Sequence, residues 1–320
     1  MAVLTDTDFM EMFNRLGARE MSKQTGVRER NIYYRRRSIE EKYNTTVSPP
    51  NPGYNNSHYA QRKSYPHRIG FTVKDGTILV GSDAHYWPGI ISTAHRAFVH
   101  FAKELRPMAI IKNGDVIDGA TISRHPPIGW ESRPSLVSEI EASQDRLNEI
   151  EAATKNWKPK LIWPLGNHDM RFGTRLATVA PEYAKLNGVH LKDHFPKWDP
   201  CWSCFINDDV VVKHRFKGGI HATHNNTMWA GKTMVTGHLH SLKVTPLTDY
   251  NGTRFGVDTG TMADPQGPQF VDYTEDGPKN WRSGFAVLTF VKGRLLWPEV
   301  VHVLDEAAGL VEFRGEMLTV

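Results

Sequence analysis

The segment from Lys160 to Asp169 reads KLIWPLGNHD. It begins with a short apolar run, which is typical of a buried strand. It ends in Gly166, Asn167, His168 and Asp169, which are polar or small and do not continue the apolar run. A strand that delivers such a group at its carboxyl end indicates a layered sheet with a ligand site along that edge.

The same pattern occurs at four further places in the chain. In each case a short apolar or β-branched run predicts a strand, and Asp or His follows at its end. The polar groups are Asp83-Ala84-His85 after 77–81, Gly114-Asp115-Val116-Ile117-Asp118 after 109–112, His214 at the end of 210–214, and Gly237-His238-Leu239-His240 after 233–236. Because ligands collect beyond the carboxyl ends of strands, we expect these side chains to meet at one site.

The rest of the chain after residue 69 predicts a layered α+β domain. Further strands are expected at 254–258, 285–290 and 295–304, the last two joined through a turn at 292–294. Helices are expected at 91–105 and 135–154. The second helix has an apolar face at helical spacing, formed by Leu136, Ile140, Leu147 and Ile150.

Composition divides the 320 residues into three regions, and the length suggests about two domains. Residues 1–44 are rich in charge, with apolar residues at helical spacing. Residues 45–68 contain four prolines and several Asn and Ser, which predicts an extended linker. Residues 69–320 form the main domain. Each of the three glycines Gly114, Gly166 and Gly237 directly precedes an expected ligand, where a missing Cβ permits close approach.

Several classes of protein are excluded by composition. Two cysteines cannot form a disulfide framework, and no apolar run is long enough for a transmembrane helix. The N-terminus lacks the pattern of a secretory signal. We therefore expect no membrane partner and a cytoplasmic location, in a bacterium or a phage-infected host. Cys201 and Cys204 resemble half of a zinc site, but no second such pair exists, which favours two reduced thiols.

Carboxylate, amide and imidazole ligands together suit borderline divalent metals such as Mn, Fe or Zn. Seven such residues are too many for one tetrahedral site. They suit two metal ions that share a bridging carboxylate and clamp the two oxygens of a phosphoryl transfer.

In their order, the five motifs resemble the calcineurin-like metallophosphoesterase superfamily, over roughly residues 77–260. The motifs GNHD and GHxH also resemble those of Mre11/SbcD-type nucleases. The resemblance implies a four-layer α/β/β/α sandwich, two divalent ions (Mn²⁺ foremost, with Fe²⁺, Zn²⁺, Ni²⁺ or Mg²⁺ as alternatives) and a metal-activated water as nucleophile. Protein phosphatases of this fold usually carry GDxVDRG and GNHE, whereas this chain has GDVIDGA and GNHD.

The resemblance also implies a role for each residue. Asp83, His85 and His240 are expected to bind the first metal, and Asn167, His214 and His238 the second, with Asp115 as the bridge. His168 is the expected catalytic residue near the leaving oxygen, and Asp118 is expected to orient it. Asp169 is expected just outside the ligand set. For the lone histidine, His221 and His224 compete with His214, which is preferred because it ends a β-branched run; the other two are then pocket or helix-cap residues.

The first 44 residues resemble a helix-turn-helix module attached to the phosphoesterase domain. Helices are expected at 6–16, 18–25 and 28–43, with Gly26 at a break. Residues 28–37 contain five Arg and one Glu. The net charge of this segment therefore equals the net charge of the whole chain, +4. The residues expected to contact DNA are Arg28, Arg30, Asn31, Arg35 and Arg36. The alternative is an oligomerisation or packing element whose arginines form a solvated face.

Together these features predict a metal-dependent phosphodiesterase that acts on nucleic acid, namely a DNA nuclease. The organisation is similar to that of phage or prophage proteins. Two alternatives remain: a phosphodiesterase or phosphatase for small molecules such as cyclic nucleotides or dinucleotides, and a DNA-binding regulator with an inactive phosphoesterase domain. The sequence does not fix the metal, the cleavage polarity, the sequence specificity or the oligomeric state.

Overall fold

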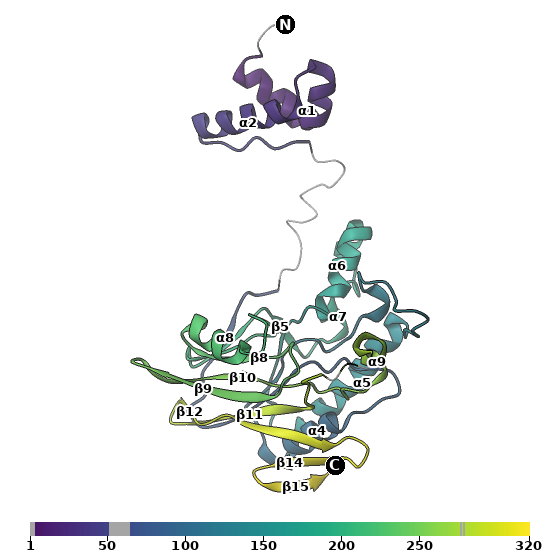
Figure 1. Cartoon of the computed structure of the whole chain (residues 1–320), viewed down its shortest axis with the longest axis vertical. Coiled ribbons are helices and arrows are strands. Elements are labelled where there is room, and N and C mark those ends of the chain that lie inside the picture. The colour runs from purple at the N-terminus through teal and green to yellow at the C-terminus, as the bar shows by residue number, and fades with distance from the viewer. Residues whose placement is uncertain (1–3, 51–64, 276, 278) are drawn as a thin grey trace. The chain divides into compact units, whose positions relative to one another are not determined.

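The structure is a computed structural model that describes residues 4–50, 65–275, 277 and 279–320. The chain divides into two compact units, Met1–Arg62 and Lys63–Val320 (Figure 1). Each unit is described by itself. Among the helices within these described ranges, none is both long enough and apolar enough to cross a membrane.

The second unit contains two β-sheets. The larger, nine-stranded sheet has the order β15 (Glu316–Thr319), β14 (Leu310–Phe313), β13 (Glu299–Asp305), β11 (Gly284–Val291), β2 (Gly76–Gly81), β3 (Ala109–Lys112), β4 (Lys160–Pro164) and β5 (Asp199–Cys201), with β12 (Arg294–Leu295) paired to β11. The six-stranded sheet has the order β1 (Ile69–Phe71), β6 (Cys204–Ile206), β7 (Val210–Val212), β8 (Thr233–Thr236), β10 (Gly252–Asp258) and β9 (Lys243–Asp249).

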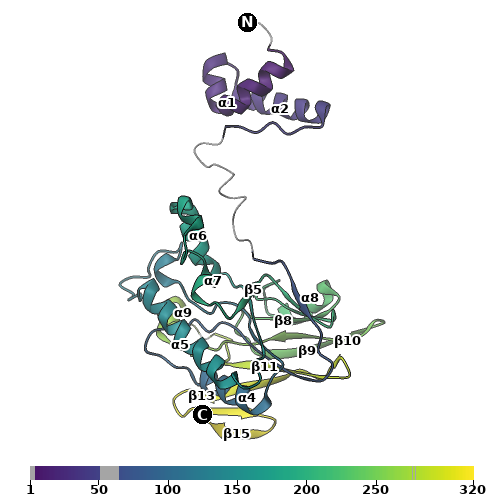
Figure 2. The ribbon, with the colours of Figure 1, turned by 180° about the vertical axis from the view of Figure 1, so that it is seen from behind.

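Helices cover the outer faces of both sheets. On the nine-stranded sheet, α4 (Thr93–Leu105) and α5 (Leu136–Thr154) form one apolar core with the strands (Figure 2). On the six-stranded sheet, α8 (Ala222–Ala230) packs against β8, β9 and β10. The remaining helical elements are η1 (Ala120–Ile122), α6 (Asp169–Val179), η2 (Pro181–Lys185), α7 (Leu191–His194) and α9 (Pro268–Thr274).

A second apolar core lies between the two sheets. Strands β2 and β3 contribute Ile78, Val80 and Ile111 to it, and β8 and β10 contribute Val235 and Val257. Side chains alternate along a strand, so the same strands also supply the helix-facing core. The result is a helix, sheet, sheet, helix stack, which confirms the predicted four-layer α+β sandwich.

Parallel pairing aligns the ends of the strands that carry the motifs. Strand β2 pairs in parallel with β3, so that Gly81 lies opposite Lys112, two and three residues before Asp83 and Asp115. Strand β3 pairs in parallel with β4, and β7 with β8. The loops that follow these strands therefore leave the sheets on the same side.

The expected long strand at 295–304 is interrupted. Strand β12 ends at Leu295 and β13 begins at Glu299, and both pair with β11. Pro298 lies in the gap and has no N–H to donate to a ladder, which accounts for the break. The sequence also gave no sign of β1, β5 or β6, because a three-residue strand is too short to show a period.

Within residues 4–50, the first unit forms three helical segments. Its first helix, α1 (Asp6–Thr25), is interrupted at Gly17, whose φ of 71° and ψ of 171° are not helical. The predicted helices at 6–16 and 18–25 are thus separate in their geometry. Gly26 ends the second with a left-handed φ of 70°, and α2 (Glu29–Tyr43) follows. The small core of this unit consists of Phe9, Phe13, Ala18, Met21, Ile32, Ile39 and Val47.

The module extends beyond its expected end at residue 44. Val47 is buried in the module's core, and its backbone N–H donates to Glu40 Oε1 at 2.9 Å. Val47, from the expected linker at 45–68, thus packs in the core of the module, and Tyr65 of the same stretch packs against the larger core. Residues 51–64 of the expected linker lie outside the described residues.

We expect Val47→Ala to destabilise the module by about 1–3 kcal/mol, because it removes buried methyl groups from a small core. Amide hydrogen exchange should become faster in α1 and α2 and stay unchanged in the sheets. The exposed neighbour Ser48 provides the matched control, Ser48→Ala. Equal exchange in the two variants would show that the segment after Tyr43 does not belong to the module.

Candidate metal centre

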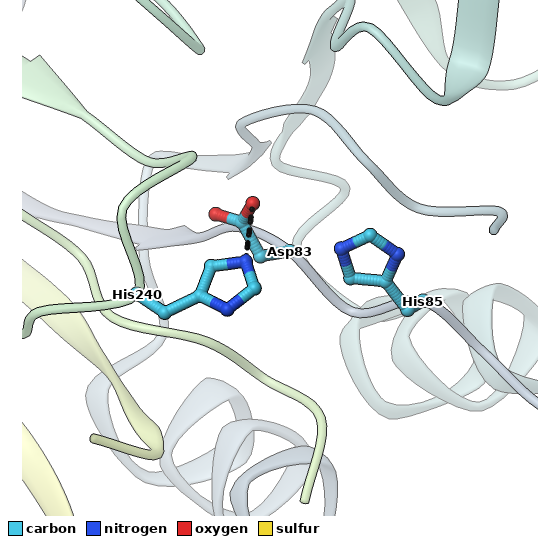
Figure 3. A group of neighbouring side chains, drawn as sticks. All are labelled: Asp83, His85 and His240. Atoms are coloured by element: carbon cyan, nitrogen blue, oxygen red, sulfur yellow. Dashed lines mark hydrogen bonds and ion pairs between the residues drawn. The ribbon is translucent and has the colours of Figure 1, made fainter. Parts of the chain in front are cut away.

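The structure brings Asp83, His85 and His240 together at the ends of β2 and β8. One ligand atom from each lies within 4.8 Å of the others. His240 Nε2 is 3.1 Å from Asp83 Oδ1, and Figure 3 shows the Asp83 side chain between the two imidazoles. All three side chains are buried. These are the three residues expected to hold the first metal.

A second group consists of Asp115, His214 and His238, whose ligand atoms also lie within 4.8 Å of one another. His214 Nε2 is 3.0 Å from Asp115 Oδ2 and 3.9 Å from Asp83 Oδ1, so the two groups adjoin. His214 Nε2 thus lies near both carboxylates, and Asp115 remains the expected bridge. Asn167 follows β4, and its Oδ1 is buried without a hydrogen-bond partner in the described structure.

Several buried polar atoms of these residues fit a divalent cation. Among the described residues, His85 Nε2, Asn167 Oδ1 and His214 Nε2 have no hydrogen-bond partner. His214 Nε2 and Asp115 Oδ2 are close, yet they are not aligned for a hydrogen bond. Leaving such atoms unsatisfied costs about 1–3 kcal/mol each. Carboxylate, amide and imidazole donors that converge in this way suit Mn²⁺, Fe²⁺ or Zn²⁺.

The backbone of the ligand residues is strained. Asp83, Asp115 and His238 have φ values of 53°, 51° and 73°, and His85 and His240 have 39° and 57°. Residues other than glycine rarely adopt this left-handed region, and such strain concentrates at functional sites. The conformation reverses the backbone just after a strand ends and so directs the ligand side chain toward the site.

Two glycines allow the ligand loops to touch. A Cβ on Gly166 would lie 2.0 Å from Asp115 Oδ1, and a Cβ on Gly114 would lie 2.4 Å from His214 Nδ1. Non-bonded heavy atoms cannot approach one another this closely. Only glycine fits where these loops cross, as the position of each glycine before a ligand suggested.

The electrostatics favour positive charge between the two groups. Burial opposes the ionised form of Asp83, but the charges of His240 and His214 outweigh it and lower the pKa of Asp83 to about 2. Burial opposes the charged form of His214, but Asp115 and Asp83 outweigh it and raise the pKa of His214 to about 10. A divalent cation supplies the positive charge that these carboxylates favour, in exchange for protons.

His168 lies beside the ligands and is held by Asp118. The rings of His168 and His85 are 4.6 Å apart. His168 Nδ1 donates to the backbone carbonyl of Asp118 at 2.8 Å and lies 3.1 Å from its carboxylate. The same carboxylate accepts from His85 Nδ1 at 2.9 Å, which leaves His85 Nε2 for a metal. Asp118 thus positions a ligand as well as the expected catalytic histidine.

Arg171 is a site residue that the sequence did not reveal. Its guanidinium donates to the carbonyl of Asp118 at 2.9 Å and lies 3.1 Å from His168 Nε2. It sits in the first turn of α6, three residues after His168. The helical spacing between the two residues could have indicated their contact if the helix start at Asp169 had been recognised.

Two further features of the site were also missed. The rings of Phe270 and Trp281 lie 5.6 and 4.5 Å from that of His240 and wall off one side of the first group. Glu139 on α5 accepts from the backbone N–H groups of Gly119 and Ala120, at 2.5 and 3.0 Å, and so fixes the loop after Asp118. Both come from segments that are distant in the sequence and carry no recognisable motif.

The competing histidines lie elsewhere. His221 occupies the N-cap position of α8 without a capping side-chain bond, and His224 contacts Asn225 within that helix. Neither occurs in a metal-ligand group among the described residues. Cys201 and Cys204 are free and buried where β5 passes into β6, and burial raises the pKa of Cys201 to about 12. This placement agrees with two inert thiols.

In the first unit, the structure separates the five residues expected to bind DNA. Arg28, Arg30 and Asn31 are exposed and line a cavity of about 540 Å³ together with Gly26, Val27 and Tyr34. Arg35 and Arg36 are not on that surface. Arg35 stacks on Phe9 and bonds to the Leu4 carbonyl, while Arg36 stacks on Phe13 and pairs with Glu40. Arg35 and Arg36 therefore pack on aromatic rings of the module itself, and DNA contact by the five residues stays a prediction.

The two stacked sheets, the flanking helices and the convergence of the ligand loops agree with the fold that the resemblance to calcineurin-like metallophosphoesterases implies. No family model matches the chain. The gene 54 protein of Mycobacterium phage L5 is 22% identical over 231 residues, which are 65% of this chain and 87% of that protein.

Two solved structures show the level of similarity. Vps29 complexed with zinc, from Entamoeba histolytica, has a TM-score of 0.39 and 13% identity over 76% of this chain and 98% of its own. A dimetal phosphatase from Danio rerio has a TM-score of 0.35 and 12% identity over 77% of this chain and 98% of its own. The chemistry of the site must therefore be derived from the side chains of this chain itself.

We expect the purified protein to bind about two Mn²⁺ ions per chain, and His214→Ala to lower this number by removing a ligand of the second group. His221→Ala and His224→Ala are matched controls and should bind as many ions as the original protein. Equilibrium dialysis followed by metal analysis measures the stoichiometry. If His214→Ala binds as many ions as the original protein and one of the controls binds fewer, the histidine replaced in that control is the ligand instead.

The raised pKa of Glu139 predicts that the free energy of unfolding of the protein depends on pH. Burial and the nearby charge of Asp118 raise the pKa of Glu139 to about 7. A carboxyl group whose pKa is raised by folding stabilises the folded state most below its ordinary pKa, and this contribution is lost as the pH rises through about 7. The free energy of unfolding of the original protein, relative to Glu139→Gln, should therefore fall between about pH 5 and pH 8. If chemical denaturation shows that the free energies of unfolding of the two proteins change with pH in the same way, the raised pKa of Glu139 is contradicted.

Proposed function

We propose that this chain hydrolyses phosphodiester bonds in nucleic acid with the help of two divalent metal ions. The observation that carries the proposal is the pair of adjoining ligand groups, Asp83-His85-His240 and Asp115-His214-His238. Asn167 adds a buried amide oxygen beside them. Bound ions would polarise the phosphate and lower the pKa of the attacking water, which is the chemistry that two-metal sites supply.

The protein's own side chains would do the rest. Asp118 holds the ring of His168 through Nδ1, so that Nε2 faces away from that anchor. We propose that His168, once protonated at Nε2 in place of its contact with Arg171, delivers that proton to the leaving oxygen, as a positioned imidazole can. Arg171, 3.1 Å from that nitrogen, would stabilise negative charge that develops on the phosphate.

The choice of nucleic acid as substrate rests on the first unit. Its second and third helices are joined by the short turn Gly26–Arg28, which is the spacing of a helix-turn-helix motif. The exposed Arg28, Arg30 and Asn31 lie at the start of α2, where such a helix contacts phosphates or base edges. Tyr34 completes this surface in place of Arg35 and Arg36. We propose that it binds DNA and that the enzyme is a DNA nuclease.

The first test is hydrolysis of bis-p-nitrophenyl phosphate with Mn²⁺. We expect activity that is lost on chelation and lost in Asp115→Ala, because that residue joins the two ligand groups. Asp145→Ala, at an exposed position on α5, is the matched control and should remain active. His168→Gln should reduce kcat by about 10²- to 10⁴-fold while metal content is unchanged. Activity that survives full chelation would disprove the two-metal mechanism.

Linear DNA, supercoiled DNA, cyclic nucleotides and dinucleotides should be compared in the same assay. Cleavage of DNA in preference to the small substrates supports the nuclease. Exclusive cleavage of cyclic nucleotides or dinucleotides would replace it with a small-molecule phosphodiesterase.

A further inference from the structure

A cavity of about 510 Å³ opens directly beside the second metal-ligand group. It is lined by the segment that follows β7 and by the loop that follows β8, and His238 belongs to both the cavity and the ligand group. Thr236, Gly237 and Leu239 form the remainder of the wall on the β8 side. A substrate whose phosphate sits at the metal centre therefore has this cavity next to it.

The cavity is strongly basic. Lys213, Arg215 and Lys217 line it, and no carboxylate is found among the described residues of its lining. Arg215 and Lys217 are exposed, so they retain their full charge in water at low cost. Three cations around one concave surface attract an anion, and a guanidinium can grip a phosphate with two parallel hydrogen bonds.

The segment that carries these cations is fixed before any ligand arrives. The side chain of Asn226, buried in α8, accepts from the backbone N–H of Lys217 at 2.9 Å and donates to its carbonyl at 3.4 Å. The Lys217 ammonium lies 3.7 Å from the ring centre of Trp229, also on α8. The backbone N–H of Lys213 donates to the carbonyl of Val235 at 3.0 Å. Preorganisation of this kind reduces the entropy cost of binding.

The basic segment is also tied to the metal centre. Lys213 and Arg215 flank the ligand His214 in the chain. His238 lines the cavity and also belongs to the second ligand group, which places the cavity within reach of the neighbouring part of a bound substrate.

We propose that this cavity is a subsite for the phosphate that neighbours the scissile phosphodiester in a nucleic-acid strand. The proposal rests on the proposed function and narrows its substrate class to esters that carry a second phosphate. Phe216 lines the same cavity and is exposed, which provides an aromatic surface for the nucleotide attached to that phosphate.

The test compares substrates that differ only in a flanking phosphate. The dinucleotide TpT lacks one, pTpT carries it at the 5′ end, and TpTp carries it at the 3′ end. With Mn²⁺ and the full chain, we expect kcat/KM for one phosphorylated form to exceed that for TpT by about tenfold or more. The double variant Arg215→Gln, Lys217→Gln should bring this ratio close to one, whereas Arg294→Gln, an exposed arginine on β12, should preserve it.

A binding measurement separates this subsite from catalysis. The fluorescence anisotropy of a labelled six-nucleotide single strand, with EDTA present, reports affinity without hydrolysis. The double variant should raise Kd by about tenfold relative to Arg294→Gln. The comparison is made in an Arg28→Gln, Arg30→Gln background, so that strand binding by the first unit does not mask the change.

The outcomes distinguish the two proposals. If the original protein hydrolyses none of the substrates but the double variant weakens strand binding, the proposed function fails and the subsite stands. If the variant changes neither the ratio nor Kd, the subsite is disproved. The subsite is also disproved if the double variant lowers kcat/KM by the same factor for TpT, for both phosphorylated forms and for bis-p-nitrophenyl phosphate. In that case the two residues would act through the metal centre.

Discussion

The buried carboxylate of Asp169 holds the metal centre together. It accepts hydrogen bonds from the backbone N–H groups of Asp115, Val116 and Gly166 at 2.8–2.9 Å and from the indole of Trp163 at 3.0 Å. One side chain thereby fastens the loop after β3 to the loop after β4. Burial, together with the charge of Asp115, raises the pKa of Asp169 to about 6. Such a group is costly to bury, and its hydrogen bonds offset that cost.

Once these two loops are fixed, the remaining constraints follow from crowding. Gly166 must lack a Cβ because Asp115 lies against it, and Gly114 because His214 does. Asp83 and His85 adopt left-handed backbone conformations in order to turn toward the same point. The protein has concentrated strain, buried carboxylates and unpaired donor atoms in one place. Two divalent cations would offset the charge of the carboxylates and bind the unpaired side-chain atoms, which is the physical basis of the proposed activity.

Much of this arrangement was predictable from the sequence. The features that were missed are those that no short local pattern determines. Strands β2, β3, β4 and β8 each end in a polar motif, so local sequence located both the strands and the candidate ligands. The packing of Arg35 and Arg36 on Phe9 and Phe13 could not be predicted, because net charge says nothing about helix phase. Arg171 was missed because its role depends on where α6 begins. The strands β1 and β6 were missed because three residues have no period, and only their partners in the sheet stabilise them.

By itself, the sequence determined which residues can chelate a metal, the order in which they occur, and the presence of a separate basic helical unit. These properties are local, since side-chain chemistry and strand or helix periodicity can be read from neighbouring residues. Only the tertiary structure decided which of His214, His221 and His224 joins the site, that Asp118 holds His85 as well as His168, and that Lys213, Arg215 and Lys217 surround one cavity beside His238. Those facts depend on how loops from different strands pack, and no short stretch of sequence contains that information.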